Sequence, residues 1–160
     1  TFRPISVATT QESHLLELNG ENMIHWLAMG IATQSVYVPF YPQGTKVPTM
    51  YKYGKETYST NSAYWVFKLA STLADRDWNK YGTDLSNAQD EAREKTTRLR
   101  YEYDQKLAKE SDPAKRIDLV NEANEKMAKT ATDIFKELSA KLITKQTGDS
   151  PLRFKMDPNL

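Results

Sequence analysis

Two stretches near the start of the chain, on either side of Asn19-Gly20, mix apolar and polar residues as half-buried strands do. They read HLLEL and ENMIHWL. Asn-Gly favours a two-residue type I′ turn, because both residues of that turn adopt positive φ. The pattern therefore predicts two antiparallel strands, at about Ser6–Leu18 and Glu21–Met29, that form a β-hairpin.

A third extended piece is predicted for the segment QSVYVPFYP at 34–42, in which apolar residues alternate with Ser and Tyr. Proline cannot donate a ladder hydrogen bond, so Pro39 and Pro42 indicate that the end of this piece lies at an edge of the sheet or leaves the sheet. A Tyr-rich loop, interrupted by Gly and Pro, follows as far as about residue 60.

Helical spacing replaces strand alternation in the second half of the chain. Asn61 or Ser62 is placed to cap a first helix. From Leu85 onward apolar residues recur every three or four positions, and Asp112 followed by Pro113 predicts a break and a new helix start. The recurring positions are Leu85, Ala88, Ala92, Leu99, Tyr103 and Leu107, then Ile117, Val120, Asn124, Met127, Ala131, Ile134 and Leu138. We expect a long antiparallel helical hairpin with one apolar seam.

These elements predict an α+β protein in which antiparallel strands pack with the helical hairpin. We expect one domain with two regions. Residues 1–60 hold the β-hairpin, the edge strand and the Tyr-rich loop, and residues 61–160 hold the helices. Acid-first pairs spaced i, i+4 indicate that the outer helix faces are solvated: Glu91–Lys95, Glu94–Arg98, Glu122–Lys126, Glu125–Lys129 and Glu137–Lys141.

The composition excludes several classes of function. A net charge of +1 gives no basic excess with which to bind nucleic acid. No apolar run approaches the roughly 20 residues that span a bilayer, so we expect no membrane partner. The chain has no Cys, which excludes disulfides, thiolate metal sites and a cysteine nucleophile within these 160 residues. These features are compatible with a cytoplasmic protein.

Thr1 and the two histidines are the first candidates for chemistry. An N-terminal Thr can act as a nucleophile with its own amine as base, but a core strand should then follow at once, and Pro4 interrupts it. We therefore favour a simple chain boundary at Thr1. With a two-residue turn, His14 lies opposite His25, and Glu12 shares their face. Two imidazoles and a carboxylate could bind a metal ion, but hydrogen-bonded sheet histidines are commoner, and we expect no metal.

An aromatic group could line a ligand groove, or it could pack between the loop, the sheet edge and the first helix. Its members are Tyr37, Phe40, Tyr41, Tyr51, Tyr53, Tyr58, Tyr64, Trp65 and Phe67. We favour packing. The chain has no Gly-rich phosphate loop, no P-loop lysine and no nucleophile elbow, so we expect no cofactor. From the residues alone, no catalytic set is complete.

Three stretches carry a family resemblance. FRPISVATTQESHLLEL, WLAMGIATQSVYVPFYP and YSTNSAYWVFKLASTLAD closely resemble the C-terminal part of the cysteine-type bacterial dipeptidases, the dipeptidase A-like family. The resemblance covers about residues 2–75 strongly, and the helical hairpin agrees with it in position and kind.

The resemblance implies a fold and a reaction. Those dipeptidases are N-terminal nucleophile hydrolases, built as a four-layer αββα sandwich, and a Cys at the mature N-terminus attacks the dipeptide. This chain would then be the C-terminal portion of such an enzyme, inactive alone, with the nucleophile in a missing N-terminal part. The resemblance further implies a dipeptide substrate and a homo-oligomer.

Few site residues follow from the resemblance. Arg3 is the basic residue placed to orient the nucleophile, as an Arg does in related amidases. Glu12 and His14 could bind the charged ends of a dipeptide, which require one acidic group and one basic or donor group. Pairing of Glu12 and His14 with neighbours on the sheet face is the competing interpretation.

Two other functions stay open from the sequence: a non-catalytic protein-interaction module built on the helical hairpin, and a small-ligand binder that uses the Tyr-rich loop. If the chain is a late piece of a sandwich, part of its sheet should lack a cover, and the isolated chain should self-associate or bind a hydrophobic dye. The residues expected to lack a cover come from Ile5, Val7, Leu16, Leu18, Trp26 and Val36.

Overall fold

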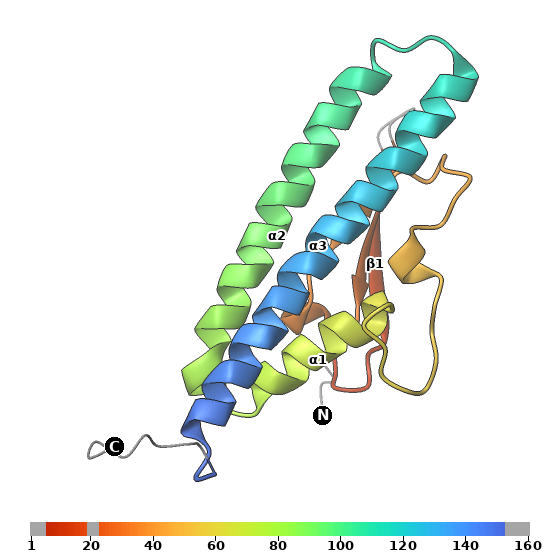
Figure 1. Cartoon of the computed structure of the whole chain (residues 1–160). Helices are drawn as coiled ribbons and strands as arrows, with labels where there is room; N and C mark the ends of the chain where they lie inside the picture. The colour runs from red at the N-terminus through yellow and green to blue at the C-terminus, as the bar shows by residue number, and fades with distance from the viewer. Residues whose placement is uncertain (1–5, 19–22, 153–160) are drawn as a thin grey trace, which may run out of the picture.

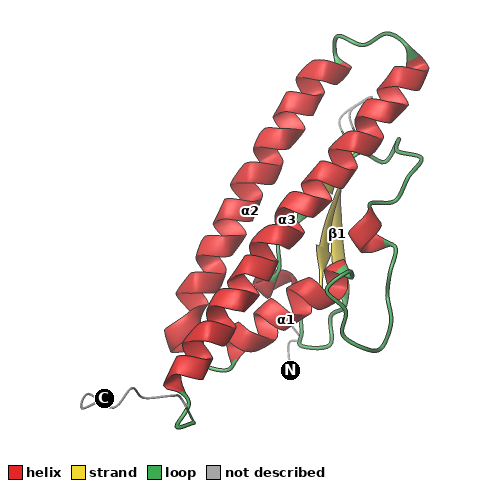
Figure 2. Ribbon diagram, in the orientation of Figure 1, coloured by secondary structure: helices red, strands yellow, loops and turns green. Residues whose placement is uncertain are grey.

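The computed structural model describes residues 6–18 and 23–152. Within these ranges the chain forms a three-stranded antiparallel sheet and three α-helices, which is the predicted α+β class (Figure 1 and Figure 2). The elements are β1 (Glu12–Glu17), β2 (Ile24–Met29), β3 (Val38–Phe40), α1 (Ala63–Asp75), α2 (Trp78–Leu107) and α3 (Pro113–Asp149), with 3-10 turns η1 (Ala32–Gln34) and η2 (Thr49–Tyr51).

Helices α2 and α3 lie side by side and form the predicted antiparallel hairpin (Figure 1). The Asp112 carboxylate accepts a hydrogen bond from the backbone N–H of Ala114, and Pro113 is the first helical residue. This arrangement confirms the predicted break between the helices. Helix α1 crosses the lower part of the hairpin in Figure 1 and packs on α3, where the Phe67 and Phe135 rings meet edge-on at a centroid distance of 4.7 Å.

The predicted apolar seam is the interface between the two long helices. All of its residues are buried except Leu99, which is half-buried, and Ile117, which is 38% exposed. Ile117 lies near the tip of the hairpin, at the opposite end from α1 (Figure 1). The seam belongs to one hydrophobic core that also contains residues of the sheet.

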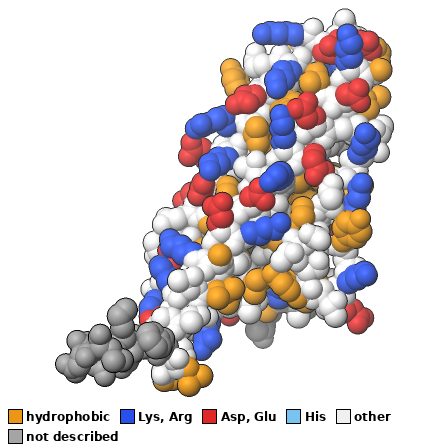
Figure 3. All heavy atoms as spheres, in the orientation of Figure 1, with side chains coloured by type: hydrophobic (Ala, Val, Ile, Leu, Met, Phe, Trp, Pro, Cys, Tyr) orange, Lys and Arg blue, Asp and Glu red, His pale blue; other side chains and the backbone are white. Residues whose placement is uncertain are grey.

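Charges of both signs are interspersed over the face of α2 and α3 that Figure 3 shows. The predicted pairs Glu91–Lys95, Glu94–Arg98 and Glu122–Lys126 form. Among the described residues no ion pair joins Glu125 to Lys129 or Glu137 to Lys141, because members of both pairs have other partners. Glu125 accepts hydrogen bonds from Thr49, and Lys141 reaches across the hairpin to Asp84.

The strands follow the order β1–β2–β3, and both neighbouring pairs are antiparallel. β3 lies at one edge, as Pro39 predicted. β1 is shorter than predicted, because residues 6–11 are not part of the strand and Val7 and Thr10 close a turn through two hydrogen bonds. β2 ends where Gly30 adopts a φ of +82°, a left-handed conformation that interrupts extended backbone.

The register of the hairpin differs from the prediction. His14 lies opposite Leu27, so the predicted pairing of His14 with His25 is wrong by two residues. The predicted turn at residues 19–20 lies outside the described residues. The observed register places Ile24 in the core, where it is 1% exposed. A shift of two residues leaves every side chain on its predicted face.

The cover over the sheet decreases from β3 to β1. All three residues of β3 are buried. In β2 only Ile24 and Ala28 are buried, and in β1 Leu15 and Leu16 are 57% and 66% exposed although they point to opposite faces. Of the residues expected to lack a cover, Leu16 and Leu18 are exposed, Val7 and Trp26 are half-buried, Val36 is buried, and Ile5 lies outside the described residues.

Side chains of α3 hold the segment that follows β3. Asn124, which is 4% exposed, accepts a hydrogen bond from the backbone N–H of Tyr41 at 2.8 Å and donates one to the Tyr41 carbonyl at 2.9 Å. Asn121 accepts a hydrogen bond from the backbone N–H of Thr45. The approach is close enough that a Cβ on Gly44 would lie 2.8 Å from Asn124 Nδ2. Helix side chains therefore satisfy backbone groups that a further strand would otherwise pair.

Candidate functional site

The candidate residues from the sequence lie at the start of the chain and on β1. Arg3 lies outside the described residues. Glu12 and His14 are both exposed, and because they are two apart on one strand they point to the same face of the sheet. Glu17 has the opposite parity and points toward Arg100 of α2. Glu12 and His14 therefore lie on the sheet face that is turned away from α2.

His14 and His25 still meet, across a diagonal of the hairpin. Their ring centroids are 5.5 Å apart, and the rings are inclined at 70°. Burial lowers the pKa of His25, the charge of His14 lowers it further, and the Glu12 carboxylate opposes both effects. The structure thus places the two imidazoles in contact, with Glu12 on the same face of the sheet.

A hollow of about 420 Å³ lies at the N-terminal end of β1, and Glu12 forms part of its wall. Ser13 Oγ and the Tyr37 hydroxyl, 2.8 Å apart, form another part. The remaining lining residues are Ser6, Thr10, Ala32 and Thr33. The Glu12 side chain points to the opposite face of β1 from Ser13, so this wall consists mainly of hydroxyl groups, which can donate or accept hydrogen bonds. It does not activate a nucleophile, because Ser13 is hydrogen-bonded to a phenol rather than to a base.

Glu17 anchors the candidate strand to α2. Its carboxylate accepts hydrogen bonds from both terminal nitrogens of Arg100, at 3.0 and 2.8 Å, and from Trp26 Nε1 at 3.0 Å. The Arg100 guanidinium also lies over the Trp26 ring, 5.6 Å from its centroid. The Arg100 hydrogen bonds hold the pKa of Glu17 below its usual value. A bidentate, charge-assisted contact therefore fixes β1 on the helical layer.

The same network continues to the end of β3. The Tyr41 hydroxyl lies 2.7 Å from the Asp104 carboxylate, to which it donates, and 3.0 Å from the backbone carbonyl of Arg100. Arg100 Nε lies 3.5 Å from Asp104. Burial, with the Asp104 hydrogen bond, raises the pKa of Tyr41 far above its usual value. The hydrogen bond that Tyr41 donates to Asp104 therefore joins the segment after β3 to α2.

The helical spacing leaves Arg100 off the apolar seam, yet the Arg100 side chain is only 21% exposed. A positional signal was present. Arg100 and Asp104 directly follow the seam residues Leu99 and Tyr103, so they stand at the margin of the buried stripe. Opposite charges spaced i, i+4 at such a margin indicate a contact with another element as readily as with water.

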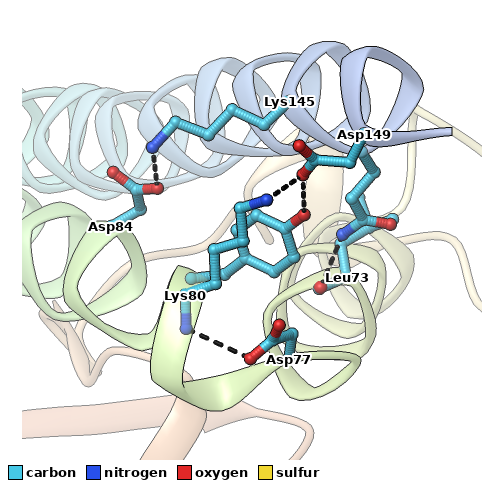
Figure 4. Close-up of polar contacts among 8 residues, drawn as sticks. Leu73, Asp77, Lys80, Asp84, Lys145 and Asp149 are labelled. Atoms are coloured by element: carbon cyan, nitrogen blue, oxygen red, sulfur yellow. Dashed lines mark hydrogen bonds and ion pairs between the residues drawn. The ribbon is translucent and has the colours of Figure 1, made fainter. Parts of the chain in front are cut away.

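A larger hollow, of about 700 Å³, lies where the ends of the three helices meet. Figure 4 shows two ion pairs at this end of the helices: Lys80 contacts Asp149, and both line the hollow, whereas Lys145 contacts Asp84 outside its lining. The Tyr81 hydroxyl donates to Asp149 as well, at 2.9 Å. These groups neutralise one another and tie α2 to the end of α3, so the arrangement is that of a structural joint.

The aromatic group divides between the core and the surface. Phe40, Tyr41 and Phe67 are buried. Tyr51 packs edge-on against Phe40 at a centroid distance of 5.1 Å, and exposed Tyr58 meets Trp65 at 6.3 Å. The hollow of about 480 Å³ beside this loop has one aromatic residue, Tyr53, in its wall. These contacts are those of packing and do not form an aromatic groove.

Two further properties limit the chemistry of the described ranges. Within residues 6–18 and 23–152, no three His, Cys, Asp or Glu side chains gather closely enough to hold a metal ion. No helix in the same ranges has both the length and the apolar character needed to cross a bilayer. The site that remains is the open face of β1 with its adjoining hollow.

The chain is similar to known proteins along nearly its whole length. Residues 1–91 match the family model of peptidase family C69. The chain is 26% identical over 159 residues to a probable dipeptidase B of Lactococcus lactis subsp. lactis (strain IL1403), and the match covers 96% of the chain and 33% of that protein. It is 24% identical over 161 residues to dipeptidase A of Lactobacillus helveticus, covering 98% of the chain and 34% of that protein.

A third relative is also matched over about a third of its length. The chain is 25% identical over 169 residues to a probable dipeptidase of Latilactobacillus sakei, and the match covers all of the chain and 34% of that protein. The chain thus spans about a third of the length of the curated relatives it matches.

Proposed function

This chain belongs to peptidase family C69, and from that premise we propose that it is the C-terminal portion of a dipeptidase that hydrolyses unblocked dipeptides. The cysteine nucleophile lies outside these 160 residues, which contain no Cys. The observation that carries the proposal is the alignment of nearly the whole chain with about a third of each of three dipeptidases. The chain alone is expected to be inactive.

The proposed reaction is acyl transfer to cysteine. The thiol of an N-terminal Cys, supplied by the rest of the enzyme, attacks the peptide carbonyl, and the free α-amine accepts the thiol proton. That proton passes to the leaving amine as the peptide bond breaks, and water then hydrolyses the thioester. Backbone or amide donors stabilise the oxyanion in both steps.

The proposed contribution of this chain is to bind the ends of the dipeptide. Glu12 pairs with the substrate ammonium group, His14 donates a hydrogen bond to its carboxylate, and Arg3 orients the nucleophile. The exposure of Glu12 and His14 on one face, beside a hollow lined with hydroxyl groups, supports the first two roles. The Glu17–Arg100 contact supports a fixed position for the strand that carries them.

The wider architecture is part of the same proposal. The sheet belongs to an αββα sandwich, with α2 and α3 in an outer layer, and the complete enzyme is a cytoplasmic homo-oligomer. The asymmetric cover supports this placement: helices protect β3, whereas β1 is exposed on both faces. The interspersed charges on the visible face of the hairpin favour a solvated layer over a docking module (Figure 3).

Glu12→Gln tests the proposed substrate contact. The chain is joined to the cysteine-bearing remainder of Lactobacillus helveticus dipeptidase A, in place of the aligned third, and hydrolysis of Leu-Gly is measured. We expect KM to rise about tenfold with little change in kcat, because the variant loses a charge-assisted hydrogen bond to the bound ammonium group.

The matched control is Glu94→Gln, which removes an exposed carboxylate of α2 that pairs with Arg98. It should leave both constants unchanged. An unaltered KM in Glu12→Gln would remove Glu12 from the proposed site. Robust hydrolysis of Leu-Gly by the isolated 160-residue chain would contradict the proposed function itself.

A further inference from the structure

The outer edge of β1 offers a regular row of backbone groups. The backbone N–H of Gly30 donates to the carbonyl of Gln11 at 2.6 Å, which marks these residues as a hydrogen-bonded pair. Such pairs alternate along an antiparallel ladder, so every second residue from Gln11 bonds to β2. The backbone N–H and C=O groups of the residues between them, Glu12, His14 and Leu16, therefore point away from β2.

The side chains beside this edge are apolar and uncovered. Leu15 and Leu16 point to opposite faces and are 57% and 66% exposed. Leu18 and Met23, at the end of the hairpin, are 76% and 41% exposed. An apolar strand that is exposed on both faces and along one edge has the pattern of a strand that a neighbouring strand and a cover on each side would bury.

The middle of β1 carries little that protects this edge against pairing. Terminal strands of natural sheets carry Lys, Pro or a bulge that discourages a further strand. β1 reads ESHLLE, which contains neither Lys nor Pro. Its two charged residues, Glu12 and Glu17, stand at its ends, and its register runs without a bulge between them. The opposite edge differs, because β3 contains Pro39 and the backbone just after it is held by Asn124.

We propose that the nucleophile-bearing part of the enzyme adds a strand along the outer edge of β1, hydrogen-bonded to the backbone of Glu12, His14 and Leu16. This inference rests on the proposed function for the identity of the partner. The relatives are about three times the length of this chain, so they contain enough further polypeptide to pair with the edge and cover both leucine faces. A dipeptide is too small to cover Leu15 and Leu16 together.

The added strand would place Glu12 and His14 at the junction between this chain and the rest of the enzyme. A strand added beside them would enclose their side chains on one face of a wider sheet, and that strand belongs to the part that carries the cysteine. The candidate substrate residues would then stand at the junction of the two parts and not on an open surface.

Amide hydrogen exchange at single residues tests whether a strand is added to the edge of β1. The isolated chain is compared with the same chain joined to the cysteine-bearing remainder of Lactobacillus helveticus dipeptidase A. The backbone amides of Glu12, His14 and Leu16 should exchange freely in the isolated chain and about a hundredfold or more slowly in the joined protein. A mixture of the two parts, examined by sedimentation, provides a second form of the same test.

Leu16→Lys supplies the matched perturbation, and Tyr101→Lys is its control. Both residues are large, apolar and 66% exposed in the chain alone, but Tyr101 lies on the solvent face of α2. Both variants should leave the thermal stability of the isolated chain unchanged. Leu16→Lys should reduce association of the mixed parts at least tenfold, and Tyr101→Lys should not.

The outcomes separate this inference from the proposed function. Protection of the three amides without Leu-Gly hydrolysis supports the added strand and contradicts the proposed dipeptidase function. Leu-Gly hydrolysis with the three amides still exchanging freely supports the proposed dipeptidase function and overturns the added strand. Free exchange in both the joined and the mixed forms also overturns it. Protection that grows with the concentration of the isolated chain, accompanied by dimers, assigns the edge to a second copy and overturns the proposed partner.

Discussion

Replacing Asn124 by Leu is expected to lower the free energy of unfolding by about 3 kcal/mol. The side chain is 4% exposed, and it hydrogen-bonds to both the N–H and the carbonyl of Tyr41. Leu has a similar volume but no polar atoms, so two buried backbone groups would lose their partners. Each such group costs about 1–3 kcal/mol when it is left unsatisfied. Denaturant unfolding followed by tryptophan fluorescence measures the change.

Asn121→Leu is the matched control on the same helix. Asn121 accepts hydrogen bonds from the backbone N–H groups of Thr45 and Lys46 and donates one to the Thr45 hydroxyl, but all three contacts lie in exposed surroundings where water replaces the lost partner. Its cost should therefore stay below about 1 kcal/mol. Equal losses in the two variants would mean that Asn124 does not hold the segment after β3 in the way described.

Arg100→Met should destabilise the chain by about 2 kcal/mol at neutral pH, because it leaves the Glu17 carboxylate without its bidentate partner. This expected loss of stability is smaller than that for breaking a fully buried ion pair, because the Arg100 and Glu17 side chains are 21% and 35% exposed. The variant also loses the stacking of the guanidinium on Trp26. Met keeps most of the aliphatic packing, so the change reports the charged contacts.

The same variant predicts a pH dependence. The folded pKa of Glu17 is lowered from 4.5, chiefly by its hydrogen bonds with Arg100. A carboxyl with a lowered folded pKa stabilises the fold above its unfolded pKa, and this stabilisation is lost as the pH falls through the folded value. The gap in unfolding free energy between the wild type and Arg100→Met should therefore shrink on acidification from about pH 5 to pH 3. A gap that stays constant over this range would show that the ion pair does not stabilise the fold.

The elements of the fold could be predicted because each has a local cause. Asp112 and Pro113 set the start of α3 through the geometry of a helix N-terminus, and the seam residues recur at helical spacing. The face of each strand residue followed from the two-residue period. The hairpin register could not be obtained in this way, because registers that differ by two residues place every side chain on the same face and alternation cannot distinguish them.

The candidate site was predictable only in part. Glu12 and His14 were placed correctly on one face by parity, and the contact between His14 and His25 survived a wrong register because a shift of two preserves faces. The partners of Glu17 were missed. Arg100 is 83 positions away, and nothing in local spacing joins a strand carboxylate to that guanidinium. Long-range polar pairs of this kind depend on the packed fold and leave little trace in a single sequence.

The central claim is that this chain is a cysteine-free portion of a family C69 dipeptidase whose nucleophile lies elsewhere. Intact-mass spectrometry of the dipeptidase purified from its natural source, before and after alkylation of cysteine, tests it most directly. We expect these 160 residues to occur within a longer polypeptide, or beside a companion chain, that gains one alkyl group at an N-terminal Cys as activity is lost. An active enzyme that contains only this chain, with a mass unchanged by alkylation, would contradict the claim.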